Sequence, residues 1–117
     1  MEAETGVSKK RVVGGVSHEE REVAELRRSR KLAVEYLRAA MESLDDPENR
    51  SAGLLALRTI VEAYGGMAAV AEEAGISREA LYRSLSPAGN PTLKTLIAVL
   101  NAVGMKLSIE KGERLAA

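Results

Sequence analysis

Two short helices joined by a tight turn are predicted by the stretch Gly66-Met-Ala-Ala-Val-Ala-Glu-Glu-Ala-Gly75-Ile-Ser-Arg-Glu-Ala-Leu-Tyr-Arg-Ser-Leu85. Its first half carries apolar residues at helical spacing, namely Met67, Val70, Ala71 and Ala74. Gly75 follows, where a chain leaving a helix often needs the left-handed conformation that glycine adopts without strain. Ser77 suits the N-cap of a second helix, because its hydroxyl can accept a free backbone N–H. This pattern is typical of a helix-turn-helix.

The second helix of this pair is predicted to have a polar outer face suited to DNA. It would bury Ala80, Leu81, Ser84 and Leu85 and expose Arg78, Glu79, Tyr82 and Arg83. Each arginine can form two hydrogen bonds with guanine or hold a phosphate, and Glu79 can accept from cytosine. Tyr82 and Ser77 can contact phosphate or a thymine methyl group. The structural alternative is an ordinary helical hairpin whose arginines are simply solvated.

Composition restricts the class of protein. A chain of 117 residues without Cys, Phe or Trp is one domain with an aliphatic core, and it has neither disulfides nor thiolate metal sites. With a single His and no nucleophile–base set, we expect no enzyme, cofactor or metal centre. No apolar run approaches the roughly 18 residues that span a bilayer, and no secretory signal is recognisable. A soluble, cytoplasmic protein without a membrane partner is expected.

The net charge of zero is unusual for a free-standing DNA-binding protein. Basic residues outnumber acidic ones, eight to six, in residues 1–31, whereas acidic residues outnumber basic ones, six to three, in residues 32–64. The acidic block consists of Glu35, Glu42, Asp45, Asp46, Glu48 and Glu62. One surface could therefore face DNA and another a basic protein. A protein-interaction module that does not bind DNA remains an alternative.

Four segments are predicted along the chain. Residues 1–17 are interpreted as a flexible basic arm, residues 18–44 as one amphipathic helix, residues 45–110 as the helix-turn-helix domain and residues 111–117 as a tail. The apolar stripe of the amphipathic helix either lies on its own domain or docks a partner protein. The candidate contacts for such a partner are Val23, Leu26, Arg30 and Leu37.

Two further helices belong to the predicted domain. The first starts at Asp45-Asp46-Pro47, with an aspartate cap and proline in the first turn, and buries Leu54, Leu57, Ile60, Val61 and Tyr64. The second starts at Asn90-Pro91-Thr92, with Asn90 as its cap, and presents a core face of Leu93, Leu96, Ile97, Leu100 and Val103. Near its start, Asn90, Thr92 and Lys94 can hold the DNA backbone.

The segment Met105-Lys-Leu-Ser-Ile-Glu110 alternates apolar and polar residues and predicts one half-buried strand. A single strand needs a neighbour for its backbone groups. Because no second strand is predicted, the same strand of another subunit is the expected partner. Met105, Leu107 and Ile109 are thus the candidate contacts of a homodimer.

Several segments together carry a family resemblance: Tyr36-Leu37, Asp46-Pro47, Tyr64-Gly-Gly-Met67, Gly75-Ile-Ser-Arg-Glu-Ala-Leu-Tyr82, Gly89-Asn-Pro91 and Gly104-Met-Lys-Leu-Ser108. Over roughly residues 35–110 the chain resembles the addiction-module antidote proteins, the antitoxin branch of the Xre or phage-repressor-like helix-turn-helix superfamily. Residues 1–30 depart from that pattern, because family members usually begin shortly before the first amphipathic helix.

The resemblance implies a mainly α fold, a repressor-like five-helix DNA-binding domain with one short C-terminal β-strand. It also implies a cytoplasmic antitoxin that neutralises a RelE/ParE-like toxin and represses their shared promoter. Such a dimer would bind double-stranded DNA at a palindromic operator. A stand-alone Xre-type repressor without a toxin partner is the nearest alternative.

Overall fold

The computed structural model describes residues 17–112, and the regular structure in that range is helical. Six helices follow one another: α1 (His18–Arg28), α2 (Arg30–Ser43), α3 (Arg50–Ala63), α4 (Gly66–Ala74), α5 (Arg78–Ser84) and α6 (Leu93–Val103). The mainly helical class is confirmed. The expected count of five helices is wrong, and no strand forms within residues 17–112. Nearly all of the predicted arm, and the last five residues of the predicted tail, lie outside the described residues.

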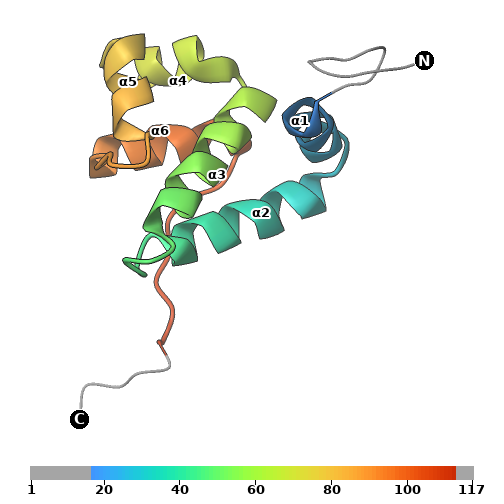
Figure 1. Ribbon diagram of the computed structural model, residues 1–117, viewed down its shortest axis with the longest axis horizontal. Coiled ribbons are helices and arrows are strands. Elements are labelled where there is room, and N and C mark those ends of the chain that lie inside the picture. The colour runs from blue at the N-terminus through green and yellow to red at the C-terminus, as the bar shows by residue number, and fades with distance from the viewer. Residues whose placement is uncertain (1–16, 113–117) are drawn as a thin grey trace.

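α3 is the central helix of the arrangement (Figure 1). It contacts α1 and α2 on one side and α4 and α6 on the other, and α5 follows α4 across the tight turn. The core is aliphatic, as the composition predicts. Its largest fully buried side chains are Leu26, Leu54, Leu57, Ile60, Val61, Val70, Leu81, Leu85, Val99 and Val103.

The helix expected over residues 18–44 is instead two helices separated at Ser29. Ser29 is extended, with φ −125° and ψ 106°, and its hydroxyl accepts from the backbone N–H of Leu32 to cap α2. Its own N–H closes the last turn of α1 at Glu25. A serine hydroxyl can compete with helical hydrogen bonding in this way. The periodicity of the apolar residues continues across the break, which is why the sequence pattern suggested one helix.

α3 begins at Arg50, later than the predicted Asp-Pro start. Asp46 does cap backbone, but in a turn: its carboxylate accepts from the N–H of Glu48 at 3.0 Å and from the side-chain amide of Asn49 at 2.7 Å. Aspartate stabilises turns by such local bonds as readily as it caps helices. The predicted core positions of this helix are confirmed, because Leu54, Leu57, Ile60 and Val61 are fully buried and Tyr64 is half-buried.

α4, its turn and α5 match the prediction closely. Gly75 has φ 74° and ψ 30°, the left-handed conformation expected at that position. Ser77 caps α5 by accepting from the backbone N–H of Ala80 at 3.0 Å. All four apolar residues predicted for the inner face of α4 are buried: Met67, Val70, Ala71 and Ala74.

The start and core face of α6 differ from the prediction. Thr92, and not Asn90, is the N-cap, and its hydroxyl accepts from the N–H of Thr95 at 3.1 Å. Leu93 and Ile97 are 62% and 40% exposed. Leu100 and Val103 are buried as predicted and Leu96 is half-buried. The helix also buries Thr95, Ala98 and Val99, since it is covered by both α4 and α3. An apolar helix with two neighbours can bury more than one face, so its periodicity alone did not identify the buried one.

The C-terminal segment does not form the expected strand. Met105 donates its N–H to Leu100 to complete the end of α6, and residues 105–112 then run without regular structure. Within residues 17–112 there is no strand with which this segment could pair. The segment instead passes along α2, where Met105 and Leu107 line a hollow with Leu37. Leu107 and Ile109 remain 45% and 99% exposed.

The helices of the described part are short. No single helix in residues 17–112 is both long and apolar enough to cross a membrane. α3 and α4 pass that test only when taken together, across a bend of 105°. Most of the apolar surface of α3 lies in the protein core.

Candidate nucleic-acid interface

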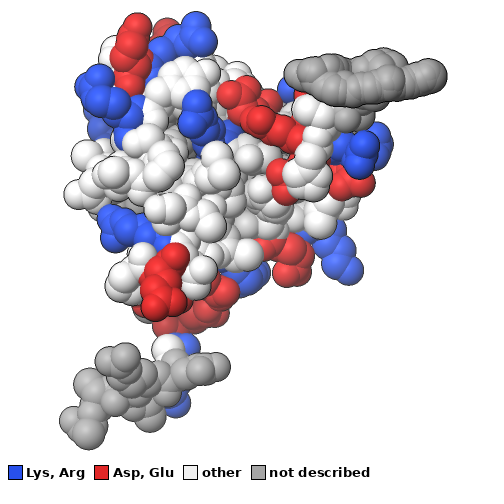
Figure 2. Space-filling view, viewed as in Figure 1, with Lys and Arg blue, Asp and Glu red and all other residues white. Residues whose placement is uncertain are grey.

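α5 presents the polar face that the sequence predicts. Arg78, Glu79 and Arg83 are exposed, while Leu81 and Leu85 are fully buried beneath them. Ala80 and Ser84, predicted to be buried, are half-buried, and so is Tyr82, which was predicted to be exposed. In Figure 2 basic side chains gather at the corner formed by α4 and α5, with acidic ones among them. The helix is anchored on one side and free to contact a partner on the other.

The ends of α5 are both fixed by short hydrogen bonds. Its N-terminal end is capped by Ser77. At its C-terminal end the hydroxyl of Ser86 donates to the carbonyl of Arg83 at 2.7 Å, and Gly89 N–H donates to the carbonyl of Ser86 at 2.8 Å. These contacts hold a helix of 7 residues, which would be unstable alone, in one orientation on the core.

Tyr82 lies beside an arginine from another helix. The Arg58 guanidinium carbon on α3 is 4.8 Å from the centroid of the Tyr82 ring, and both residues are half-buried. Sequence reasoning missed Arg58. The available signal was an arginine that interrupts an apolar run, between Leu57 and Thr59.

The three predicted backbone-contact residues near α6 fall in different surroundings. Asn90 accepts at its Oδ1 from the guanidinium of Arg50, at 3.2 Å, so the start of α3 lies beside the loop after α5. The hydroxyl of Thr92 serves the cap of α6. The ammonium of Lys94 lies at the helix-turn-helix, 3.1 Å from the place that a Cβ on Gly75 would occupy.

Cationic side chains outnumber carboxylates in this region. The cations are Arg50, Arg58, Arg78, Arg83 and Lys94, and the carboxylates are Glu79 on α5 and the exposed Glu72 and Glu73 on α4. Affinity for nucleic acid depends on neutralising phosphates locally, so a neutral chain can bind DNA through such a surface. The overall net charge of zero is therefore compatible with DNA binding.

The predicted toxin contacts are not brought together on one surface. Leu26 and Leu37 lie in the core, 1% and 4% exposed. Val23 is half-buried, and Arg30 is exposed with its guanidinium close to Gly104 at the end of α6. A partner that docks on the folded surface can reach Val23 and Arg30 but not the two leucines.

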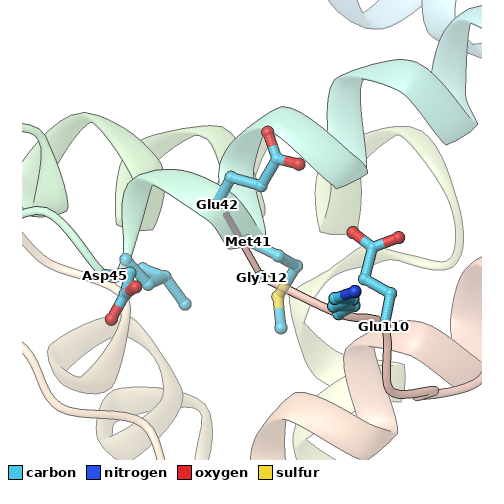
Figure 3. Close-up of a pocket in the computed structure, with 7 residues that line it drawn as sticks. Met41, Glu42, Asp45, Glu110 and Gly112 are labelled. Atoms are coloured by element: carbon cyan, nitrogen blue, oxygen red, sulfur yellow. The ribbon is translucent and has the colours of Figure 1, made fainter. Parts of the chain in front are cut away.

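A second hollow lies where α2 ends and the C-terminal segment passes (Figure 3). Three carboxylates line it, those of Glu42, Asp45 and Glu110, and in this view Asp45 points away from the side to which Glu42 and Glu110 point. Within residues 17–112 no three His, Asp or Glu side chains lie close enough together to hold a metal ion. The carboxylates of this hollow therefore do not form a candidate metal site.

Comparison with known proteins agrees with the sequence resemblance to antidote proteins. The model of a family described as probable addiction module antidote protein matches residues 17–111. An uncharacterized protein from Haemophilus influenzae is 42% identical over 45 residues, which are 38% of this chain and 46% of that protein, so the match spans less than half of the relative's length. No solved structure matches the chain. Because the family match extends over most of its length, the chain belongs to the family of probable addiction module antidote proteins.

Proposed function

We propose that this chain is the DNA-binding antitoxin of a type II toxin–antitoxin pair, of the Xre or phage-repressor-like kind, and that it represses its own promoter. One observation carries the DNA-binding part. A short helix, capped at Ser77 and following a left-handed glycine, exposes Arg78 and Arg83 on a surface rich in cations. A helix that reads the major groove needs this combination of a fixed backbone and exposed hydrogen-bond donors.

The proposed mechanism inserts α5 into the major groove of double-stranded DNA. Arg78 and Arg83 would bind guanine edges or phosphates, and Glu79 would accept from cytosine. Asn90 and Lys94 would contact the DNA backbone and set the register of α5, because contacts to phosphate position a protein without reading sequence. Thr92 contributes by fixing the start of α6.

A palindromic operator would require two copies of this chain. In a helix-turn-helix dimer the two recognition helices bind half-sites about 34 Å apart, one turn of DNA. The exposed side chains of Leu107 and Ile109 support the C-terminal segment as the contact between copies. In the described residues, the backbone N–H groups of this segment beyond Met105 have no helix or strand partner.

The toxin is proposed to bind away from α5. The acidic residues of α2 and of the turn after it are exposed, namely Glu35, Glu42, Asp45, Asp46 and Glu48. In Figure 2 acidic side chains gather at the α2–α3 turn, away from the α5 corner. A basic RelE/ParE-like toxin would complement that surface. Val23 and Arg30 are further accessible contacts, on α1 and α2.

Two experiments test the two halves of the proposal. Footprinting of the purified chain on DNA from upstream of its own reading frame should reveal protection of two half-sites one helical turn apart. Co-expression with the neighbouring reading frame should rescue growth that this frame alone inhibits. Protection without rescue would favour a stand-alone repressor. Rescue without protection would favour an interaction module of the same fold.

A further inference from the structure

Arg58 and Tyr82 form a contact between two helices that are not consecutive in the chain. The guanidinium carbon of Arg58, on α3, is 4.8 Å from the centroid of the Tyr82 ring on α5. A guanidinium over an aromatic face is attracted by the ring quadrupole. The ring takes up none of the five guanidinium N–H donors, so these remain available to acceptors at the edge of the group.

Tyr82 is half-buried at the edge of the polar face of α5, where its ring also packs against the core. Arg78 and Tyr82 are four residues apart in α5, so helical spacing places them next to each other on the same side of the helix. The Arg58 guanidinium therefore lies beside the face that carries Arg78, although it comes from α3. The two arginines flank one tyrosine, from two different helices.

A second arginine of α3 is attached to the same region. Arg50, in the first turn of α3, donates to the side chain of Asn90 in the loop between α5 and α6. Arg50 and Arg58 are eight positions apart in α3, so their backbones are about 12 Å apart along the helix. The hydroxyl of Ser51 also donates to the carbonyl of Pro87 at 3.0 Å, which fixes this end of α3 to that loop.

We propose that α3 forms a second strip of the DNA interface, in which Arg58, oriented by the ring of Tyr82, binds a backbone phosphate beside the groove that α5 enters. The inference rests on the proposed DNA-binding function. Tyr82 is then a positioning residue for Arg58. Arg58 belongs to a helix beside α5, so it meets the sugar–phosphate edge and not the base edges. The planar guanidinium suits phosphate oxygens, which accept two parallel hydrogen bonds from it.

The test measures how DNA binding depends on salt. Each phosphate contact contributes about 0.9 to the slope of log affinity against log salt. Arg58→Gln should therefore lower that slope by about one and weaken binding to operator and random duplexes alike, by roughly threefold to tenfold in dilute salt. Arg38→Gln, at an exposed position on α2, is the matched control and should leave the slope unchanged.

The role of Tyr82 is tested by coupling. Tyr82→Phe keeps the ring and should therefore keep the contribution of Arg58 to the salt slope, whereas Tyr82→Ala should lose it. If the ring acts through Arg58, the double variant Arg58→Gln/Tyr82→Ala should bind no more weakly than the weaker of the two single variants. Fully additive losses would overturn the positioning role. Thermal unfolding of each variant shows whether the fold is retained.

The outcomes separate this inference from the proposed function. An Arg58→Gln protein with the wild-type slope, beside an Arg78→Ala/Arg83→Ala protein that has lost specific binding, would overturn the α3 strip and leave the proposed function intact. A wild-type chain without measurable affinity for any duplex would overturn both. A smaller slope for Arg58→Gln on operator and random DNA alike supports the strip.

Discussion

Arg27 of α1 caps the end of α3 at Ala63: its Nε donates to the Ala63 carbonyl at 3.1 Å, and its Nη2 donates to the carbonyl of Glu62 at 3.1 Å. The hydroxyl of Tyr64 donates in return to the carbonyl of Leu26, near the end of α1. Each helix thus satisfies carbonyl groups that the other helix leaves without an intrahelical partner. Positive charge at a helix C-terminus is also favourable to the helix dipole. α1 is part of the folded body.

Arg27→Ala should lower the free energy of unfolding by about 1–2 kcal/mol, since it removes two hydrogen bonds from a charged donor at a partly exposed site. Thermal unfolding measures this, with an expected shift of roughly 4–8 °C per kcal/mol for a domain of this size. Arg28→Ala is the control, because Arg28 is exposed in the same last turn of α1. Equal stability of the two variants would show that the contact between α1 and α3 contributes little.

The helix pair of residues 66–85 could be predicted because its signals are local. Gly75 adopts the left-handed conformation and Ser77 caps α5, and both effects involve only residues a few positions away in the chain. The break at Ser29 could not be predicted in this way, because a serine can lie inside a helix or cap the start of a new one. The buried face of α6 depends on which helices cover it, a long-range property that periodicity does not contain.

Gly89→Ala should destabilise the loop that follows α5. A Cβ at this position would lie 2.2 Å from the backbone oxygen of Ser84 and 2.5 Å from that of Arg83, so backbone must move to admit it. Small-to-large changes in packed sites typically cost about 1–3 kcal/mol. Gly112→Ala is the control, since nothing lies within 4 Å of its Cβ position. Denaturant unfolding of the two variants compares them, and equal midpoints would contradict the tight turn.

Ser77→Ala should cost about 0.5–2 kcal/mol of stability through loss of the cap of α5, whereas Ser77→Gly should cost only a few tenths. The difference arises because glycine leaves the first N–H groups of the helix accessible to water. Chemical denaturation of both variants measures it. If alanine and glycine are equally tolerated, the hydrogen bond from the Ala80 N–H to the Ser77 hydroxyl does not stabilise the helix.

The candidate site could be predicted only where it depends on neighbouring residues of one helix. The outward residues of α5 follow from the spacing within one helix, and Arg78 and Arg83 are exposed as expected. Arg58 and Arg50 reach the same surface only because their side chains extend from α3 to Tyr82 on α5 and to Asn90 in the loop that follows. Conversely, Leu26 and Leu37 belong to the expected stripe of a docking helix, but the fold covers that stripe with α3.

Leu107→Pro should weaken association of two copies if the C-terminal segments pair with each other. Proline removes one backbone N–H and is excluded from the interior of a paired strand. Light scattering at micromolar concentration should give a dimer for the wild type and a monomer for the variant. A dimer that persists in the variant would place the contact elsewhere, and the exposed side chains of Leu93 and Ile97 on α6 are the next residues to substitute.

The most direct test of the account is fluorescence anisotropy with a labelled DNA fragment from upstream of the chain's own reading frame. The wild type should bind this fragment more tightly than random DNA. Arg78→Ala/Arg83→Ala should lose about 1–3 kcal/mol of that discrimination for each bidentate base contact removed, with little change in thermal stability. If the double variant discriminates as well as the wild type, α5 does not read this DNA, and the proposed recognition surface is wrong.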